Sequence, residues 1–151
     1  MNEIARIQDQ LRRAHDGDAW HGPSLCSLLT DVRADRAAAR PIPGVHSISE
    51  IVGHITAWQR VVVRRLGGER VVDIPEPENW PAAVGDEAAW KGVKDRLQRS
   101  HVDLLAAIGQ LGEAQLENQV DGMNYSVYVM LHGAVQHLLY HAGQIALLKK
   151  A

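Results

Sequence analysis

The last long stretch of the chain constrains its fold most. From Ser126 to Lys149, apolar residues recur every three or four positions, the spacing that gathers side chains on one face of an α-helix. His137 and His141 lie in this stretch four positions apart, so their imidazoles stack on the same side of the helix. At about 100° per residue, His141 falls near the middle of the apolar face and His137 near its edge. We therefore expect both rings to point into the protein.

Three earlier stretches have the same helical spacing, and no stretch alternates as a β-strand does. Ser47 and Glu50 form the capping-box pattern at the start of the second of these stretches, and Asp86 is a suitable N-cap for the third. The long helices are expected at Asn2–Ala14, Ser47–Leu66, Asp86–Leu111 and Ser126–Lys149, with short ones near Leu25–Leu29 and Asp31–Ala39. This pattern predicts an all-α fold, a four-helix bundle with extra short helices.

Composition limits the classes of partner. At 151 residues the chain is expected to form one domain over residues 1–151. Its 16 basic and 18 acidic residues provide no basic surface for nucleic acid. No apolar stretch is long enough to cross a bilayer, and the first residues lack the layout of a signal peptide. Cys26 is the only cysteine, which fits a reducing compartment. We expect a cytoplasmic protein with no nucleic-acid or membrane partner.

The paired histidines of the last helix predict a metal site. A buried imidazole without a partner is costly, and a metal ion held by His137 and His141 would remove that cost for both. The third ligand we expect is His54, at the edge of the apolar face of the second long helix and one turn before Trp58. In the alternative interpretation, each inward imidazole bonds a neighbouring side chain or carbonyl, and His54 is a boundary residue beside Trp58.

The other histidines have more than one interpretation. His101 falls on the apolar face of the third long helix, where it would line the pocket, lie at a subunit interface or touch the metal. His132 falls opposite the apolar face of the last helix and is expected in solvent, and His15 is expected at the surface. His21 and His46 lie beside turns, either as the rim of a pocket or as solvated loop residues.

Several further residues are expected near the site. Gln144 lies one heptad beyond the first paired histidine, where it would hydrogen-bond a ligand ring. Glycines inside helices cost stability, so Gly53, Gly133 and Gly143 are expected where helices approach closely beside the site. The proline-containing stretch from Glu69 to Gly85 is either a lid over the pocket or a crossover between helices.

Four segments, in order along nearly the whole chain, resemble the DinB/YfiT-like family. They are residues 19–25 (Ala-Trp-His-Gly-Pro-Ser-Leu), 40–48 (Arg-Pro-Ile-Pro-Gly-Val-His-Ser-Ile), 50–55 (Glu-Ile-Val-Gly-His-Ile) with Trp58, and 136–145 (Gln-His-Leu-Leu-Tyr-His-Ala-Gly-Gln-Ile). The resemblance implies a four-helix bundle, commonly a homodimer. It also implies a divalent metal ion, often nickel or zinc, held by one histidine of the second helix and two of the fourth. Those positions correspond to His54, His137 and His141.

The same resemblance implies a range of activities. The superfamily includes thiol-dependent S-transferases, an isomerase that uses low-molecular-weight thiols, and metal-dependent hydrolases. We therefore expect a thiol S-transferase or a hydrolase that acts on a small molecule. The alternative is a non-catalytic, dimeric metal-binding scaffold or sensor, which a protein ligand such as His101 in the fourth metal position would favour. An open position that faces a pocket would favour an enzyme.

The residues themselves restrict the chemistry. Three neutral imidazoles leave the positive charge of the ion uncompensated, and that charge activates a thiol or water for attack. The sequence offers no general base close to the ligands, because Glu50 is claimed by the capping box. This absence favours thiol transfer, which needs only an activated nucleophile. Histidine ligands suit zinc, nickel, copper and iron, so the residues alone do not select the metal, and no residue is assigned a catalytic role beyond metal binding.

Overall fold

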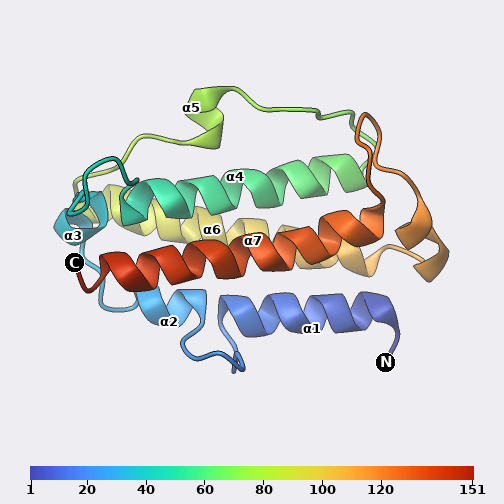
Figure 1. Ribbon diagram of the computed structural model, residues 1–151, viewed down its shortest axis with the longest axis horizontal. Helices are drawn as coiled ribbons and strands as arrows, with labels where there is room; N and C mark the ends of the chain where they lie inside the picture. Colours follow the sequence, from blue (N-terminus) through green and yellow to red (C-terminus); the bar gives the residue numbers. More distant parts are fainter.

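A computed structural model describes residues 1–151 and contains helices but no strands. Four long helices form a bundle, with short helices in the connections (Figure 1). The long helices are α1 (Glu3–His15), α4 (Ile48–Leu66), α6 (Glu87–Gly109) and α7 (Val127–Leu148), and the short ones are α2 (Leu25–Leu29), α3 (Ala34–Ala38), α5 (Glu76–Asn79) and the 3₁₀ helix η1 (Glu113–Glu117). The predicted four-helix bundle is confirmed.

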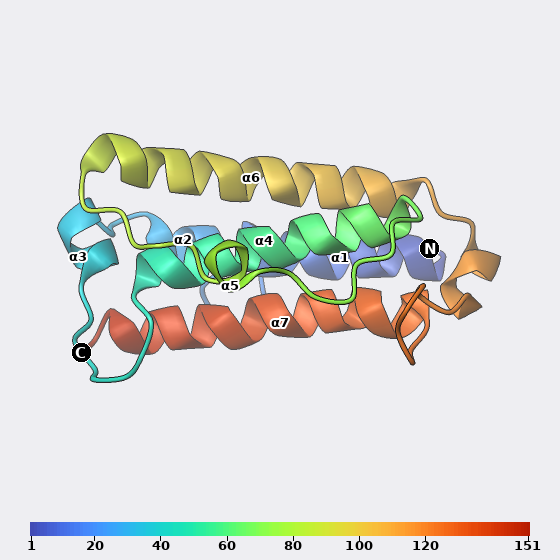
Figure 2. The same cartoon turned by 90° about the horizontal axis from the view of Figure 1, so that it is seen from above.

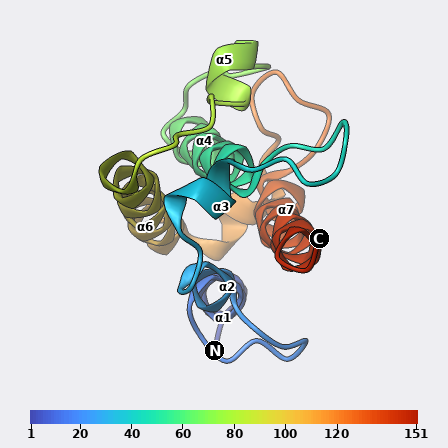
Figure 3. The same cartoon turned by 90° about the vertical axis from the view of Figure 1, so that its left-hand side faces the viewer.

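The arrangement of the helices is clearest when the bundle is seen end-on (Figure 3). α1 and α2 follow one another along one corner, α4, α6 and α7 occupy the other three, and α3 lies across one end. α4 and α7 run antiparallel beside each other, and α5 lies outside α4 (Figure 2). None of the helices is long and apolar enough to cross a bilayer.

The predicted helix starts are confirmed by their caps. The Ser47 hydroxyl accepts from the Glu50 amide at 3.2 Å, while the Glu50 carboxylate accepts from the Ser47 amide at 2.7 Å. Asp86 and Ser126 accept in the same way from the amides three positions on, at 2.8 and 3.3 Å. These bonds satisfy amides that would otherwise lack a partner in the first turn, each contributing about 1 kcal/mol. They fix where α4, α6 and α7 begin.

Two large apolar clusters fill the bundle, and a third, small one packs Val71 and Ile74 of the α4–α5 connection against α4. The larger one joins the first half of α4, the first half of α6 and the last half of α7 to α2 and α3. The second large one joins α1, the last half of α6, η1 and the first half of α7. Trp90 is fully buried in the larger cluster, and its indole N–H donates to the Val32 carbonyl at 2.7 Å. This bond ties α6 to the α2–α3 connection.

A pair of stacked histidines interrupts the core between α1 and α6. The prediction that His15 lies at the surface is wrong, because α1 extends to this residue and keeps it on the same inner face as Leu11 and Ala14. The His15 ring stacks on His101, with ring centroids 3.7 Å apart and planes 8° apart. Both ring nitrogens of His101 are buried and lack a hydrogen-bond partner. Burial is the main reason that the pKa of His101 falls to about 3.

Candidate metal centre

The three histidines singled out in the sequence meet between α4 and α7. The Nε2 atom of His137 lies 3.1 Å from Nε2 of His54 and 3.1 Å from Nε2 of His141. One nitrogen from each ring lies within 4.8 Å of the others. His54 and His141 are buried and His137 is half-buried, in agreement with the helical-wheel analysis of α7. His101 takes no part in this cluster, because it lies in the stack with His15.

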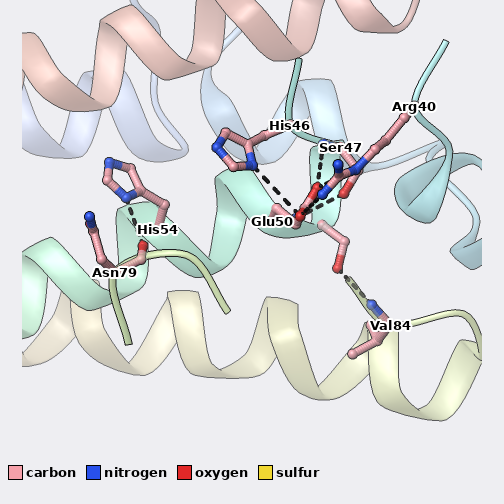
Figure 4. Close-up of polar contacts among 8 residues, drawn as sticks. Arg40, His46, Ser47, Glu50, His54, Asn79 and Val84 are labelled. Carbon is pink, nitrogen blue, oxygen red and sulfur yellow. Dashed lines mark hydrogen bonds and ion pairs between the residues drawn. The ribbon is translucent and has the colours of Figure 1, made fainter. Parts of the chain in front are cut away.

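Two of the rings have their orientation fixed from behind. The Nδ1 atom of His54 lies 2.8 Å from the backbone oxygen of Asn79, which can only accept, so Nδ1 carries the hydrogen (Figure 4). The Nδ1 atom of His141 lies 2.7 Å from Oε1 of Gln144, which also accepts. The predicted contact between Gln144 and a paired histidine is confirmed. In both rings Nε2 therefore presents a lone pair to the cluster.

The positions of the ring hydrogens decide whether the cluster suits a metal ion or hydrogen bonds among the rings. Nε2 of His137 lies between two lone pairs, and the single hydrogen that it can carry satisfies only one of them. A cation would satisfy all three nitrogens together. Two nitrogens bound to one tetrahedral zinc ion lie about 3.3 Å apart, given Zn–N bonds of about 2.0 to 2.1 Å, close to the 3.1 Å spacings seen here. The donor set therefore fits a divalent metal better than it fits hydrogen bonding among the rings.

The same environment keeps the rings neutral, as metal ligands must be. Burial lowers the pKa of His137 to about 3, and the neighbouring rings of His141 and His54 add to the effect. Burial is also the largest cause of the lowered pKa values of His54 and His141. No proton has to be removed from these rings at neutral pH before they can bind a cation.

The connection between α4 and α6 covers the outer side of His54. Trp80, just after α5, stacks on His54 with ring centroids 3.8 Å apart and planes 6° apart. It stacks in the same way on His46, at 3.7 Å and 8°. The stretch from Glu69 to Gly85 is the crossover from α4 to α6, and through Trp80 it also covers His54. The sequence did not indicate that Trp80 and Asn79 contact His54. The only signal in the sequence was that Trp80 is an aromatic residue in a proline-containing segment.

Of the three helical glycines predicted beside the site, only Gly53 lies where the α4–α6 connection approaches a helix closely. A Cβ atom on Gly53 would approach the ring of Pro81 to 3.2 Å, so the glycine allows the connection to lie close against α4. The prediction of close helix approach is wrong for Gly133 and Gly143, since a Cβ atom on either would meet nothing within 4 Å. Gly133 instead borders an open space.

The remaining predicted residues lie around the cluster or away from it. Glu50 is held by the Ser47 amide and by Arg40, with His46 at 3.6 Å (Figure 4). Burial alone would raise the pKa of Glu50, but these hydrogen bonds outweigh it and lower the pKa to about 2. His46 thus belongs to the rim, through its contacts with Trp80 and Glu50. His21 is exposed, and the half-exposed His132 lies 3.2 Å from the Glu3 carboxylate.

A cavity of about 270 Å³ lies between α4 and α7, directly beside His137. Its walls come mainly from one face of each helix. They are formed by Ile55, Trp58, Gln59, Val62, Arg65, Tyr125, Val129, Met130, Gly133, Ala134, His137 and Leu138. The cluster of imidazoles is therefore open to a space that a small molecule can enter.

The family model of the DinB superfamily matches residues 20–145. The chain belongs to the DinB superfamily. This agrees with the resemblance carried by the four sequence segments. No curated protein matches the sequence. A solved structure from Enterococcus faecalis, described as the conserved protein of locus, is similar over 99% of this chain and 96% of that chain, with a TM-score of 0.77 and 19% identity. At that identity the similarity concerns the fold, and it extends to the full length of this DinB-superfamily chain.

Proposed function

We propose that this DinB-superfamily protein is a metal-dependent enzyme in which His54, His137 and His141 hold zinc or nickel. We further propose that it transfers a low-molecular-weight thiol to a small electrophile, with hydrolysis as the alternative reaction. The observation that carries the proposal is the convergence of three Nε2 atoms, two of them with lone pairs fixed inward, at the mouth of a cavity. When bound, a divalent ion supplies positive charge that stabilises the anionic form of a thiol or water beside it.

The surrounding residues have defined roles in this proposal. The Asn79 carbonyl and Gln144 orient two ligand rings, as outer-shell partners of metal-binding histidines do. Trp80 covers His54 and keeps water from that side. Three neutral ligands leave the charge of the ion uncompensated, and no acidic residue joins the cluster. Glu50, the nearest acid along α4, is held by Ser47 and Arg40, so no general base is at hand for hydrolysis. This favours thiol transfer.

Two observations favour an enzyme over a non-catalytic scaffold. His101, the residue that would have closed the coordination sphere, is stacked on His15 and is absent from the cluster. The cavity beside His137 provides room for a substrate. A sensor or scaffold would need neither an open position nor a cavity.

The test of the reaction uses untagged protein loaded with zinc or nickel. We expect monochlorobimane to be conjugated faster than the uncatalysed rate with at least one of cysteine, coenzyme A and glutathione. The rate should fall to background in His137→Ala and persist in His21→Ala, which changes an exposed histidine outside the cluster. Cleavage of 4-nitrophenyl acetate without any thiol would favour hydrolysis instead. No turnover of either compound by metal-loaded protein would favour the scaffold.

We also propose that the protein is a homodimer that pairs through α7. Tyr140 and Leu147 are each 67% exposed and lie seven positions apart, so they form an exposed apolar strip on one side of this helix. Light scattering after gel filtration is expected to give twice the mass of the chain for the wild type and a monomer for Leu147→Glu. Val102→Glu changes a similarly exposed apolar residue on α6 and should leave the dimer intact. A monomeric wild type would contradict this assembly.

A further inference from the structure

The cavity between α4 and α7 has a lining of unusual polarity. Eight of its 12 lining residues are hydrophobic, and none is acidic. Apart from His137 and the indole N–H of Trp58, which donates to Asn79, the polar groups of the lining residues are the side chains of Gln59 and Arg65 and the hydroxyl of Tyr125. The cavity therefore combines apolar walls with one permanent positive charge.

That charge has no anionic partner. Arg65 is only 9% exposed, yet no carboxylate lies within 4.0 Å of its guanidinium group. Its Nε atom donates to the Val71 carbonyl at 2.9 Å, and Nη1 donates to the Tyr125 hydroxyl at 2.9 Å. The contacts of Nη2 are long, at 3.5 Å to the Val72 oxygen and 3.8 Å to the Met123 sulfur. A buried cation with only neutral partners is costly, and an anion in the cavity would compensate it.

Two neighbouring groups also have hydrogens to donate. The Tyr125 oxygen accepts from Arg65, so its own O–H is available to an acceptor. Gln59 is 6% exposed, and its Oε1 atom accepts from the Ser100 hydroxyl at 2.5 Å. The Nε2 atom of Gln59 is buried and has no hydrogen-bond partner. Arg65 and Tyr125 therefore have donors for a ligand with acceptor oxygens in the cavity, while the Gln59 amide nitrogen is buried in the wall.

The shape of the cavity limits the rest of the ligand. The lining residues of α4 run from Ile55 to Arg65, roughly 15 Å along the helix at 1.5 Å per residue. The volume of about 270 Å³ is just below the usual range for small-molecule sites, about 300 to 1,000 Å³. The ligand is therefore slender. Gly133 and Ala134 on α7 are small and leave space in the cavity, and Trp58 contributes an aromatic ring to the lining from α4.

We propose that this cavity binds the substrate and that the substrate is a slender organic carboxylate with an apolar body. Its carboxylate lies against Arg65 and Tyr125, its apolar body lies between α4 and α7, and its reacting end faces His137. The assignment of the reacting end rests on the proposed function. The carboxylate subsite does not, because Arg65 lies three helical turns along α4 from His54.

The test compares 4-phenylbutanoate with 4-phenylbutanamide, which has the same shape and no charge. Titration calorimetry is carried out on metal-loaded and on chelator-treated protein. We expect the carboxylate to bind at least 10-fold more tightly than the amide in both states. Arg65→Met should remove this preference, and Tyr125→Phe should weaken carboxylate binding a few-fold. Gly133→Leu, which places a side chain in the cavity without a backbone clash, should block both compounds. Gly143→Leu makes the same change on an exposed part of α7 and should leave binding intact.

The outcomes separate this inference from the proposed function. Equal affinity for the two compounds, or carboxylate binding that disappears on chelation and is unchanged in Arg65→Met, would overturn the inference even if the metal site exists. Arg65-dependent binding by protein that takes up no metal would support the carboxylate subsite while the proposed function fails. If Arg65→Met does not fold because Val71 and Tyr125 lose their donor, Tyr125→Phe and Gly133→Leu still decide.

Discussion

Replacement of His137 by alanine is expected to lower the metal content of the protein from about one ion per chain to a trace. His137 is the central residue of the cluster and the central ligand of the proposed site, since its Nε2 atom alone lies 3.1 Å from both other Nε2 atoms. Two histidines would remain, fewer than the three protein ligands that catalytic zinc sites keep. Mass spectrometry of the metal content of untagged protein, after reloading with zinc or nickel and gel filtration, measures the effect directly.

The same variant should lose the stabilisation that the metal provides. A ligand that binds only the folded state at about 100 times its Kd adds about 2.7 kcal/mol to the free energy of unfolding. We expect zinc or nickel to raise the melting temperature of the wild type and to leave His137→Ala unchanged. Gln144→Ala removes the partner of His141 without removing a ligand, and should weaken metal binding about 10- to 100-fold.

His21→Ala is the matched control for these measurements, because His21 is exposed and outside the cluster. It should bind as much metal as the wild type. A wild type that holds no zinc or nickel even after reloading would mean that the three histidines are core residues, and the proposed enzyme would lose its basis.

The part of the site that the sequence predicted depends on helix geometry. His137 and His141 share a face because of their spacing, and the helical wheel placed that face inward without knowledge of any partner. The placement of His54 depends on which helices pack together. The helical pattern made His54 the candidate because a bundle can bring its face against the last helix, and the resemblance to the DinB/YfiT-like family supported the choice; the contact of His54 with His137 agrees with both. The caps at Ser47 and Asp86 were equally predictable, because a cap and its amide lie three residues apart.

The parts that the sequence did not predict depend on long-range contacts. Trp80 lies in a connection without periodicity, so nothing local shows that it stacks on His54. Gly133 was expected where helices meet, but it borders the cavity, and a glycine in a helix has the same local pattern in both cases. The stack of His15 on His101 arises where α1 and α6 pack, and no local pattern shows that contact.

Without metal, the protein is expected to lose stability steeply as the pH falls below about 6.5. Burial lowers the pKa of His101 and of His137 to about 3, and it also lowers the pKa values of His15, His54 and His141. The unfolded chain has ordinary values near 6.5, so below that pH it takes up protons that the folded chain does not. Above about pH 6.5 these histidines are neutral in both states, so their titration does not reduce the free energy of unfolding. As the pH falls below about 6.5, the free energy of unfolding declines by about 1.4 kcal/mol per pH unit for each such histidine, until the pH reaches the pKa of that histidine in the folded chain.

His101→Leu isolates the part of this effect that is independent of the metal cluster. His101 has no hydrogen-bond partner to lose, and the groups that face it, His15 and Arg12, both oppose its protonation. Urea unfolding of chelator-treated protein between pH 6 and pH 4 should therefore show a slope shallower by about 1.4 kcal/mol per pH unit than that of the wild type. The lowered pKa of Glu50 contributes a slope below about pH 4.5, but Glu50 is present in both proteins, so this contribution cancels in the comparison. An unchanged slope in His101→Leu would mean that the buried imidazole is protonated in the folded protein, which would require an acceptor that the packing of α1 against α6 does not provide.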